Sequence, residues 1–76
     1  MATDNDVLTL IKDENRRSFT VDDVPDRDAD VFYTNFVVPL RRLRNSSVVE
    51  QLAELPDRQN RVVRVDVVGG INLNEI

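Results

Sequence analysis

The feature that most constrains the fold of this chain is a stretch near its C-terminal end in which apolar and charged residues alternate. Between residues 61 and 68, the valines Val63, Val65 and Val67 alternate with Arg64 and Asp66. Successive side chains of a β-strand point to opposite faces, so the alternation predicts a strand with one buried and one exposed face. Any fold proposed for the chain must therefore place apolar residues against one side of this strand.

Residues that disfavour a β-strand flank this segment on both sides. The run Pro56–Asn60 before it is rich in turn-forming residues and predicts a turn. Gly69 and Gly70 follow it and are expected to end it. Residues 69–76 are then expected to form a tail, or an apolar patch of Ile71, Leu73 and Ile76 that pairs two chains.

The N-terminal segment allows two interpretations. Val7, Leu8, Leu10 and Ile11 fit one face of a helix, with Asp4 or Asn5 as its cap. The alternative is a hairpin in which residues 7–12 and 17–21 pair across a turn at 13–16. We favour the helix because Leu10-Ile11 breaks the alternation of a strand, and we expect residues 1–5 to be frayed.

A second helix start is predicted at Thr20. Its hydroxyl can cap the helix, and Asp23 stands three residues later, where a carboxylate can accept hydrogen bonds from backbone amides that have no partner within the helix. Pro25 prevents a long helix unless it falls in the first turn. The acidic residues 26–30 predict a solvated connector, since they lack the glycine and closing glutamate of a calcium loop.

The next two segments are each ambiguous between helix and strand. A helix from about Thr34 would bury Phe36, Leu40 and Leu43, but Pro39 argues against it, and Val31–Val38 could be a strand that this proline stops. In the same way, Ser47 and Glu50 form a capping box for a helix through Leu55, while the segment could also be a strand. A strand at 31–38 followed by a helix at 47–55 would give a different α+β fold.

Composition excludes several function classes. The 76 residues allow one domain, and 41% hydrophobic residues suffice for a core. The absence of Cys and His excludes thiol chemistry, disulfides and the usual zinc sites. No combination of base, nucleophile and oxyanion donor is visible, so we expect no enzyme, no cofactor and no metal. No apolar run or signal pattern predicts a membrane segment, which makes a cytoplasmic location the expectation.

The net charge of −4 is unevenly distributed. Residues 1–30 hold nine acids and four bases, whereas residues 31–65 hold three acids and six arginines. The acidic start would repel DNA and the arginine-rich middle would attract it. The excess of Asp, Arg and Val resembles proteins of salt-loving archaea or their viruses, although a GC-biased genome gives a similar excess of Arg over Lys.

Residues 19–65 resemble winged helix-turn-helix DNA-binding domains in the order and spacing of their segments. The matching segments, in order, are the capped second helix (Phe19–Val24), the end of the recognition helix (Leu40–Leu43), the step into the first wing strand (Ser47–Glu50), and the wing tip with its return strand (Pro56–Val65). The chain departs from the family pattern in three places: Ser47 replaces the usual Gly, Pro39 interrupts the recognition helix, and the span from Val49 to Pro56 is longer than in the shortest wings.

The resemblance implies a small α+β winged helix-turn-helix domain over residues 1–76, with about three helices and a C-terminal β-hairpin wing. It also implies sequence-specific duplex DNA binding by a small, homodimeric transcriptional regulator. The third helix would enter the major groove and the wing would contact the backbone or minor groove. The implied DNA-binding residues are Thr34, Asn35, Val38, Arg41, Arg42 and Asn45 on the helix, and Arg58, Gln59, Asn60 and Arg61 at the wing tip, whereas Arg44 on the flank would be structural.

The acidic N-terminal half supports a different function. A dedicated DNA-binding domain is usually basic, whereas this chain is acidic overall. The alternative is therefore a protein–protein interaction module of viral or plasmid origin that does not bind DNA.

Overall fold

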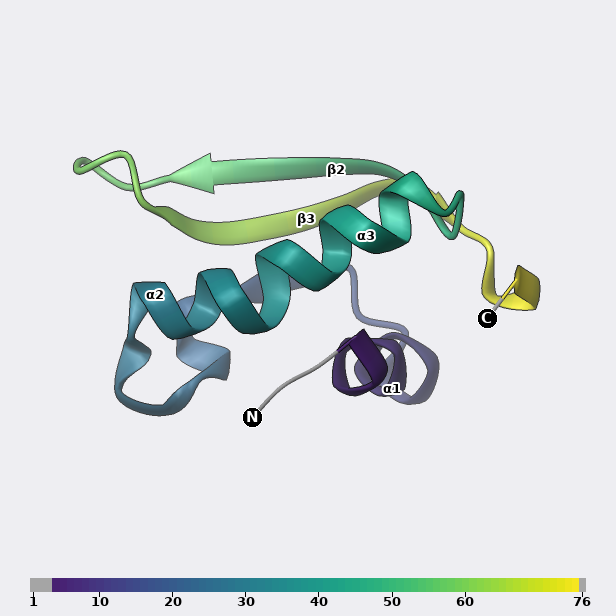
Figure 1. The fold of residues 1–76 in the computed structure, drawn as a ribbon, viewed down its shortest axis with the longest axis horizontal. Helices are drawn as coiled ribbons and strands as arrows, with labels where there is room; N and C mark the ends of the chain where they lie inside the picture. Colours follow the sequence, from purple (N-terminus) through teal and green to yellow (C-terminus); the bar gives the residue numbers. More distant parts are fainter. Residues whose placement is uncertain (1–3, 76) are drawn as a thin grey trace.

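The computed structural model describes residues 4–75. Its helices and strands are, in chain order, α1 (Asp4–Glu14), β1 (Ser18–Thr20), α2 (Ala29–Phe32), α3 (Val38–Asn45), β2 (Val49–Pro56) and β3 (Val62–Ile71). A π turn, Tyr33–Val37, joins α2 to α3, so residues 29–45 run as one long helix (Figure 1). The fold is a small α+β domain with two helices and a three-stranded sheet.

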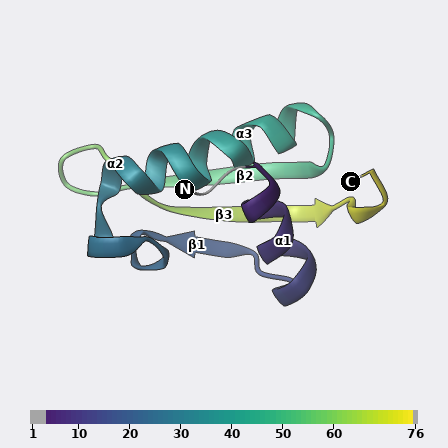
Figure 2. The same cartoon turned by 60° about the horizontal axis from the view of Figure 1, so that its bottom comes forward.

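The sheet is antiparallel, and its strands lie in the order β1-β3-β2. Strands β2 and β3 form a C-terminal hairpin, and the short β1 pairs with the other edge of β3. Both helices lie on the same side of the sheet, as the two views in Figures 1 and 2 show. The opposite face carries exposed side chains, including Leu55 and Val68.

Three phenylalanines form the centre of the core between the two layers. The ring of Phe36 lies 5.6 Å from that of Phe19 on β1 and 5.6 Å from that of Phe32 on α2. Complete burial of such a side chain stabilises a fold by about 1.5–3 kcal/mol. The other buried apolar residues are Val7, Ile11, Val24, Val37, Leu40, Leu43, Val48, Val49, Val65 and Val67.

The structure decides the two helix-or-strand alternatives of the first half. The N-terminal helix is confirmed, and the hairpin alternative is wrong. The strand alternative for Val31–Val38 is also wrong, because this stretch is helical. The long helix begins at Ala29, before the predicted Thr34, because the Asp28 carboxylate accepts hydrogen bonds from the amides of Asp30 (2.9 Å) and Val31 (3.3 Å).

The predicted second helix is reduced to a single 3₁₀ turn, Val21–Asp23. Its capping box is confirmed: Thr20 Oγ1 accepts from the Asp22 amide (3.2 Å), and Asp23 Oδ2 accepts from the Thr20 amide (2.9 Å). Pro25 ends the turn because the residue before a proline is driven to an extended conformation, and Val24 has φ −116° and ψ 155°. The fold therefore has two helices where about three were expected.

The helix alternative for residues 47–55 is wrong and the strand alternative is confirmed, because this segment forms β2. Ser47 ends the long helix in a left-handed conformation (φ 65°). The Val48 amide bonds to the Leu43 carbonyl (3.0 Å) and the Ser47 amide to the Arg44 carbonyl (3.2 Å), which is a Schellman motif. Ser47 thus adopts the conformation that the usual glycine would supply, and it cannot also begin a new helix.

Strand β3 continues through the two glycines that were expected to end it. Ile71 pairs with Val49, so β3 extends to Ile71 and the expected tail is shorter. Gly69 has φ 88°, and a Cβ at this position would lie 2.9 Å from Glu50 Oε2. That oxygen accepts a hydrogen bond from the Gly70 amide (2.9 Å), which holds the strand ends together.

A short 3₁₀ turn, Leu73–Glu75, follows β3. The proposed apolar patch includes Ile76, which lies outside the described residues, as do residues 1–3 of the expected frayed start. Asp4 and Asn5 belong to α1.

The conformation of Ser47 predicts a stabilising substitution. Ser47→Gly removes the steric cost of a left-handed residue and should raise the free energy of unfolding by about 0.5–1 kcal/mol. Chemical denaturation would measure this change. Ser46→Gly is the matched control, since Ser46 has φ −92° and gains no steric relief. An equal gain from both substitutions would contradict the explanation.

Candidate nucleic-acid interface

The β2–β3 hairpin runs back along the long helix, so its tip lies beside the N-terminal end of that helix (Figure 1). A crevice of about 180 Å³ separates the two, lined by Ala29, Asp30 and Tyr33 from the helix and by Asn60, Arg61 and Val62 from the hairpin. Both surfaces are thus presented at one end of the molecule.

Pro39 shapes the exposed face of the helix. Proline has no N–H and its ring clashes with the carbonyl four residues earlier, which here belongs to Asn35. The backbone forms a π turn at this point, and the Val38 amide bonds to the Tyr33 carbonyl, five residues back. The extra residue in this turn rotates the side chains of α3 about the helix axis relative to those of α2. As a consequence, Tyr33 and Arg41 lie on the same face of the helix and are in contact.

The six residues predicted for the helix are not all available to a ligand. Thr34, Arg41, Arg42 and Asn45 are exposed and Val38 is half-buried. Asn35 is only 8% exposed, so it is left out of the candidate surface. Thr34 lies near the hairpin-tip end, whereas Arg41, Arg42 and Asn45 lie on α3, in the other half of the helix.

Arg41 is bound to the hairpin. Its Nε and Nη2 donate to both carboxylate oxygens of Glu54 on β2, at 2.9 and 2.6 Å, and its Nη1 donates to the Tyr33 hydroxyl at 2.6 Å. The guanidinium also lies over the Tyr33 ring, 5.1 Å from its centroid. The hydrogen bonds from Arg41 lower the pKa of Glu54, and those to Glu54 raise the pKa of Arg41.

Asp57 accepts the hydrogen bonds that shape the tip of the β2–β3 hairpin. Its Oδ1 accepts from the amides of Gln59 (2.8 Å) and Arg61 (3.0 Å), and its Oδ2 accepts from the Arg61 guanidinium (2.9 and 3.1 Å). Asn60 takes a left-handed conformation (φ 61°) that closes the turn. Arg58, Gln59, Asn60 and Arg61 are all exposed, as expected, but Arg61 is already paired with Asp57.

Acidic side chains stand close to the same end of the molecule. Asp26 and Asp28 immediately precede the long helix, and Asp30 in its first turn lines the crevice beside the hairpin tip. Negative charge at a helix N-terminus stabilises the helix but repels phosphate. The candidate surface is therefore mixed in charge, and it is less basic than the count of arginines in residues 31–65 indicates.

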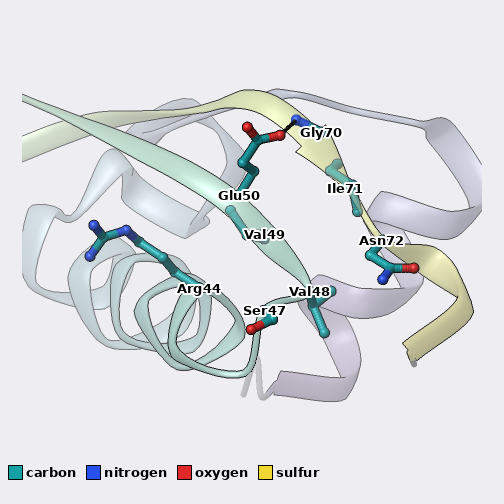
Figure 3. A pocket seen from close by; sticks show the side chains of 8 residues that line it. All are labelled: Arg44, Ser47, Val48, Val49, Glu50, Gly70, Ile71 and Asn72. Carbon is teal, nitrogen blue, oxygen red and sulfur yellow. Dashed lines mark hydrogen bonds between the residues drawn. The ribbon is translucent and has the colours of Figure 1, made fainter.

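A second, larger groove of about 590 Å³ lies at the other end of the hairpin, lined by Arg44, Ser47, Val48, Val49, Glu50, Gly70, Ile71 and Asn72 (Figure 3). Its polar groups do not converge on one point. Glu50 is bound to the Gly70 amide, and Arg44 extends away from Ile71 and Asn72. This groove does not present a constellation for chemistry.

Other kinds of site find no support in residues 4–75. Among the side chains that the structure describes, no cluster of three or more acidic groups is arranged to hold a metal ion. Within the same range, no helix has the length and apolar character needed to cross a membrane.

Comparison of the chain with known protein families, with curated proteins and with solved structures found no match. The candidate surface therefore rests on the geometry of this chain alone.

Sequence reasoning missed the roles of Tyr33, Glu54 and Asp57. The Asp57 interaction had a local signal, because an aspartate that begins a turn often accepts from amides two to four residues later. The contact between Arg41 and Glu54 had none, because it joins elements whose relative position depends on the whole fold.

The buried Asn35 predicts a gain in stability on substitution. Its side chain makes no hydrogen bond with the described residues, and such a group costs about 1–3 kcal/mol when buried. Asn35→Leu should therefore raise the free energy of unfolding by about 1 kcal/mol in chemical denaturation. Thr34→Leu, at the exposed neighbouring position, should give no gain. A loss of stability in Asn35→Leu would mean that the amide has a stabilising partner.

The hairpin carboxylates predict a pH dependence. The pKa of Glu54 lies below its ordinary value of 4.5 and that of Asp57 below 3.8, because both accept hydrogen bonds in the folded state. A carboxylate whose pKa is lower in the folded state than in the unfolded state stabilises the fold when the pH is above its unfolded-state pKa. This stabilisation is lost as the pH falls through the folded-state pKa. NMR titration of the side-chain carboxyl carbons should give both midpoints below the ordinary values, and midpoints at or above them would contradict the contacts.

Proposed function

We propose that this chain is a small winged-helix-type module that binds duplex DNA as a transcriptional regulator. The observation that carries the proposal is the order of elements: α1, β1, the long helix and a C-terminal hairpin, with β1 and β2 on either side of β3. This order agrees with the resemblance of residues 19–65 to winged helix-turn-helix domains. The main departure is the pair of 3₁₀ turns at 21–27, which replaces the helix before the recognition helix.

The placement of the hairpin tip supports a specific binding geometry. The N-terminal half of the long helix would enter the major groove while the wing tip contacts the neighbouring backbone or minor groove. Thr34, Arg58, Gln59, Asn60 and Arg61 are the predicted residues of this end, although Arg61 is paired with Asp57. Val38, Arg42 and Asn45 lie further along the helix and would contact flanking phosphates.

The charges of this surface limit the affinity for DNA. Arg41 and Arg61 are neutralised by carboxylates of the same chain, and acidic residues flank the start of the helix. If about two or three phosphates are neutralised, the logarithm of the binding constant should fall with a slope of about −2 to −3 against the logarithm of salt concentration. This is a shallow dependence, so base contacts and shape would contribute much of the binding.

Two further features belong to this proposal. A homodimer would let the chain bind two half-sites of an operator, and sedimentation equilibrium would test that state. A cytoplasmic location, with access to the genome, fits the same role.

The charge balance favours a second candidate function, a protein-interaction module. The net charge of −4 and the acidic residues around the start of the long helix would attract a basic protein surface rather than DNA. Binding to a protein partner without affinity for DNA would support this candidate.

A salt series tests DNA binding directly. We expect fluorescence anisotropy with a mixed library of labelled duplexes to show binding at low salt that weakens with the slope given above. Arg58→Ala at the wing tip should weaken binding and make the slope shallower by about one. Arg64→Ala is the matched control: it removes the same charge from the opposite face of the hairpin, where Arg64 pairs with Asp66.

The absence of any binding at low salt by the folded chain would rule out the DNA proposal. Equal losses from Arg58→Ala and Arg64→Ala would show that only net charge matters and that the wing tip is not the contact.

A further inference from the structure

Arg41 adds a polar side-chain link between the long helix and β2, two elements that also pack together through the core. It lies on the long helix, and its partner Glu54 lies on β2, one of the two edge strands of the sheet. Tyr33, from the π turn that precedes α3, accepts a hydrogen bond from the same guanidinium through its hydroxyl. We call these three residues the Arg41 clamp.

The clamp is stronger than an ordinary surface ion pair. Most exposed pairs contribute little, because water screens them and two long side chains lose freedom. Here the guanidinium binds both carboxylate oxygens, donates to a hydroxyl and lies over an aromatic ring. The Arg41 and Glu54 side chains are 45% and 28% exposed, so the pair is partly shielded from water.

The clamp acts on the part of the hairpin that most needs support. A two-stranded ribbon twists freely unless its side chains pack on another element. Strand β1 (Ser18–Thr20) pairs with residues 64–66 of β3 and does not reach the tip. Glu54 stands two residues before Pro56, where β2 ends, so a link here fixes the direction in which the tip projects.

We propose that Arg41 is a positioning residue, which sets the angle of the β2–β3 wing against the long helix rather than binding phosphate itself. The consequence for DNA binding rests on the proposed function. With the clamp formed, the wing tip and the start of the helix would meet one duplex together. With the clamp broken, each surface would bind alone.

One substitution separates positioning from direct phosphate contact because the two roles predict opposite signs. Glu54→Gln removes a negative charge and releases Arg41. If Arg41 binds phosphate, DNA affinity should rise. If Arg41 positions the wing, affinity should fall, by about tenfold.

The control is Asp66→Asn, which removes the same charge from a carboxylate that also binds an arginine of the hairpin, but on the opposite face. It should leave affinity unchanged or raise it slightly. Arg41→Lys keeps the charge but loses the planar guanidinium that can donate two hydrogen bonds to one carboxylate, so it should weaken DNA binding as Glu54→Gln does. The double variant Arg41→Gln/Glu54→Gln should lose no more than either single change, because the two residues act through one contact.

A measurement without DNA keeps the test independent of the proposed function. Residual dipolar couplings of the backbone amides report the orientation of the hairpin relative to the long helix. They should change at residues 55–62 in Glu54→Gln and stay the same in Asp66→Asn. If the wild-type chain binds no DNA, the proposed function fails, yet these couplings still decide whether Arg41 positions the wing.

Two results would overturn the inference. One is a rise in DNA affinity in Glu54→Gln, which would make Arg41 a phosphate ligand. The other is an unchanged set of couplings in a folded Glu54→Gln variant, which would show that the hairpin keeps its direction without the clamp.

Discussion

Pro39 stands in the middle of the long helix, and both faces of that helix depend on how the backbone accommodates it. A regular α-helix would set the proline ring against the Asn35 carbonyl. The π turn, in which the Val38 amide bonds to the Tyr33 carbonyl, relieves this conflict and rotates everything that follows. On the inner side, Phe32, Phe36, Leu40 and Leu43 all reach the core. On the outer side, the rotation aligns Tyr33 with Arg41 and turns both toward β2.

The parts of the fold that local chemistry determines could be predicted from the sequence. The alternation of Val63, Val65 and Val67 predicted β3, and the spacing of Thr20 and Asp23 predicted the capping box, because neighbours alone decide both; the helix expected to follow that cap is only one turn. The errors arose where a local signal supported two outcomes. Ser47 and Glu50 match a capping box in sequence, but tertiary packing places Ser47 at the end of one helix and Glu50 beside Gly70.

The candidate surface was harder to predict than the fold. Its exposed residues were found because a helix face and a turn can be drawn from the sequence. What these residues do depends on partners that are distant along the chain. Arg41 looked like a phosphate ligand until its carboxylate partner on β2 was placed, and Asn35, which was expected to contact DNA, is only 8% exposed.

Gly69 has a consequence for the whole hairpin. Two antiparallel strands can slide past each other, and a shift by one residue would exchange the faces of every side chain. The left-handed backbone at Gly69 and the Glu50 carboxylate against it restrict the alignment, since every residue of β3 except the two glycines would bring a Cβ into that space. Two glycines far from the hairpin tip thus restrict the register of the two strands, in which Glu54 faces the helix while Arg64 and Asp66 face away.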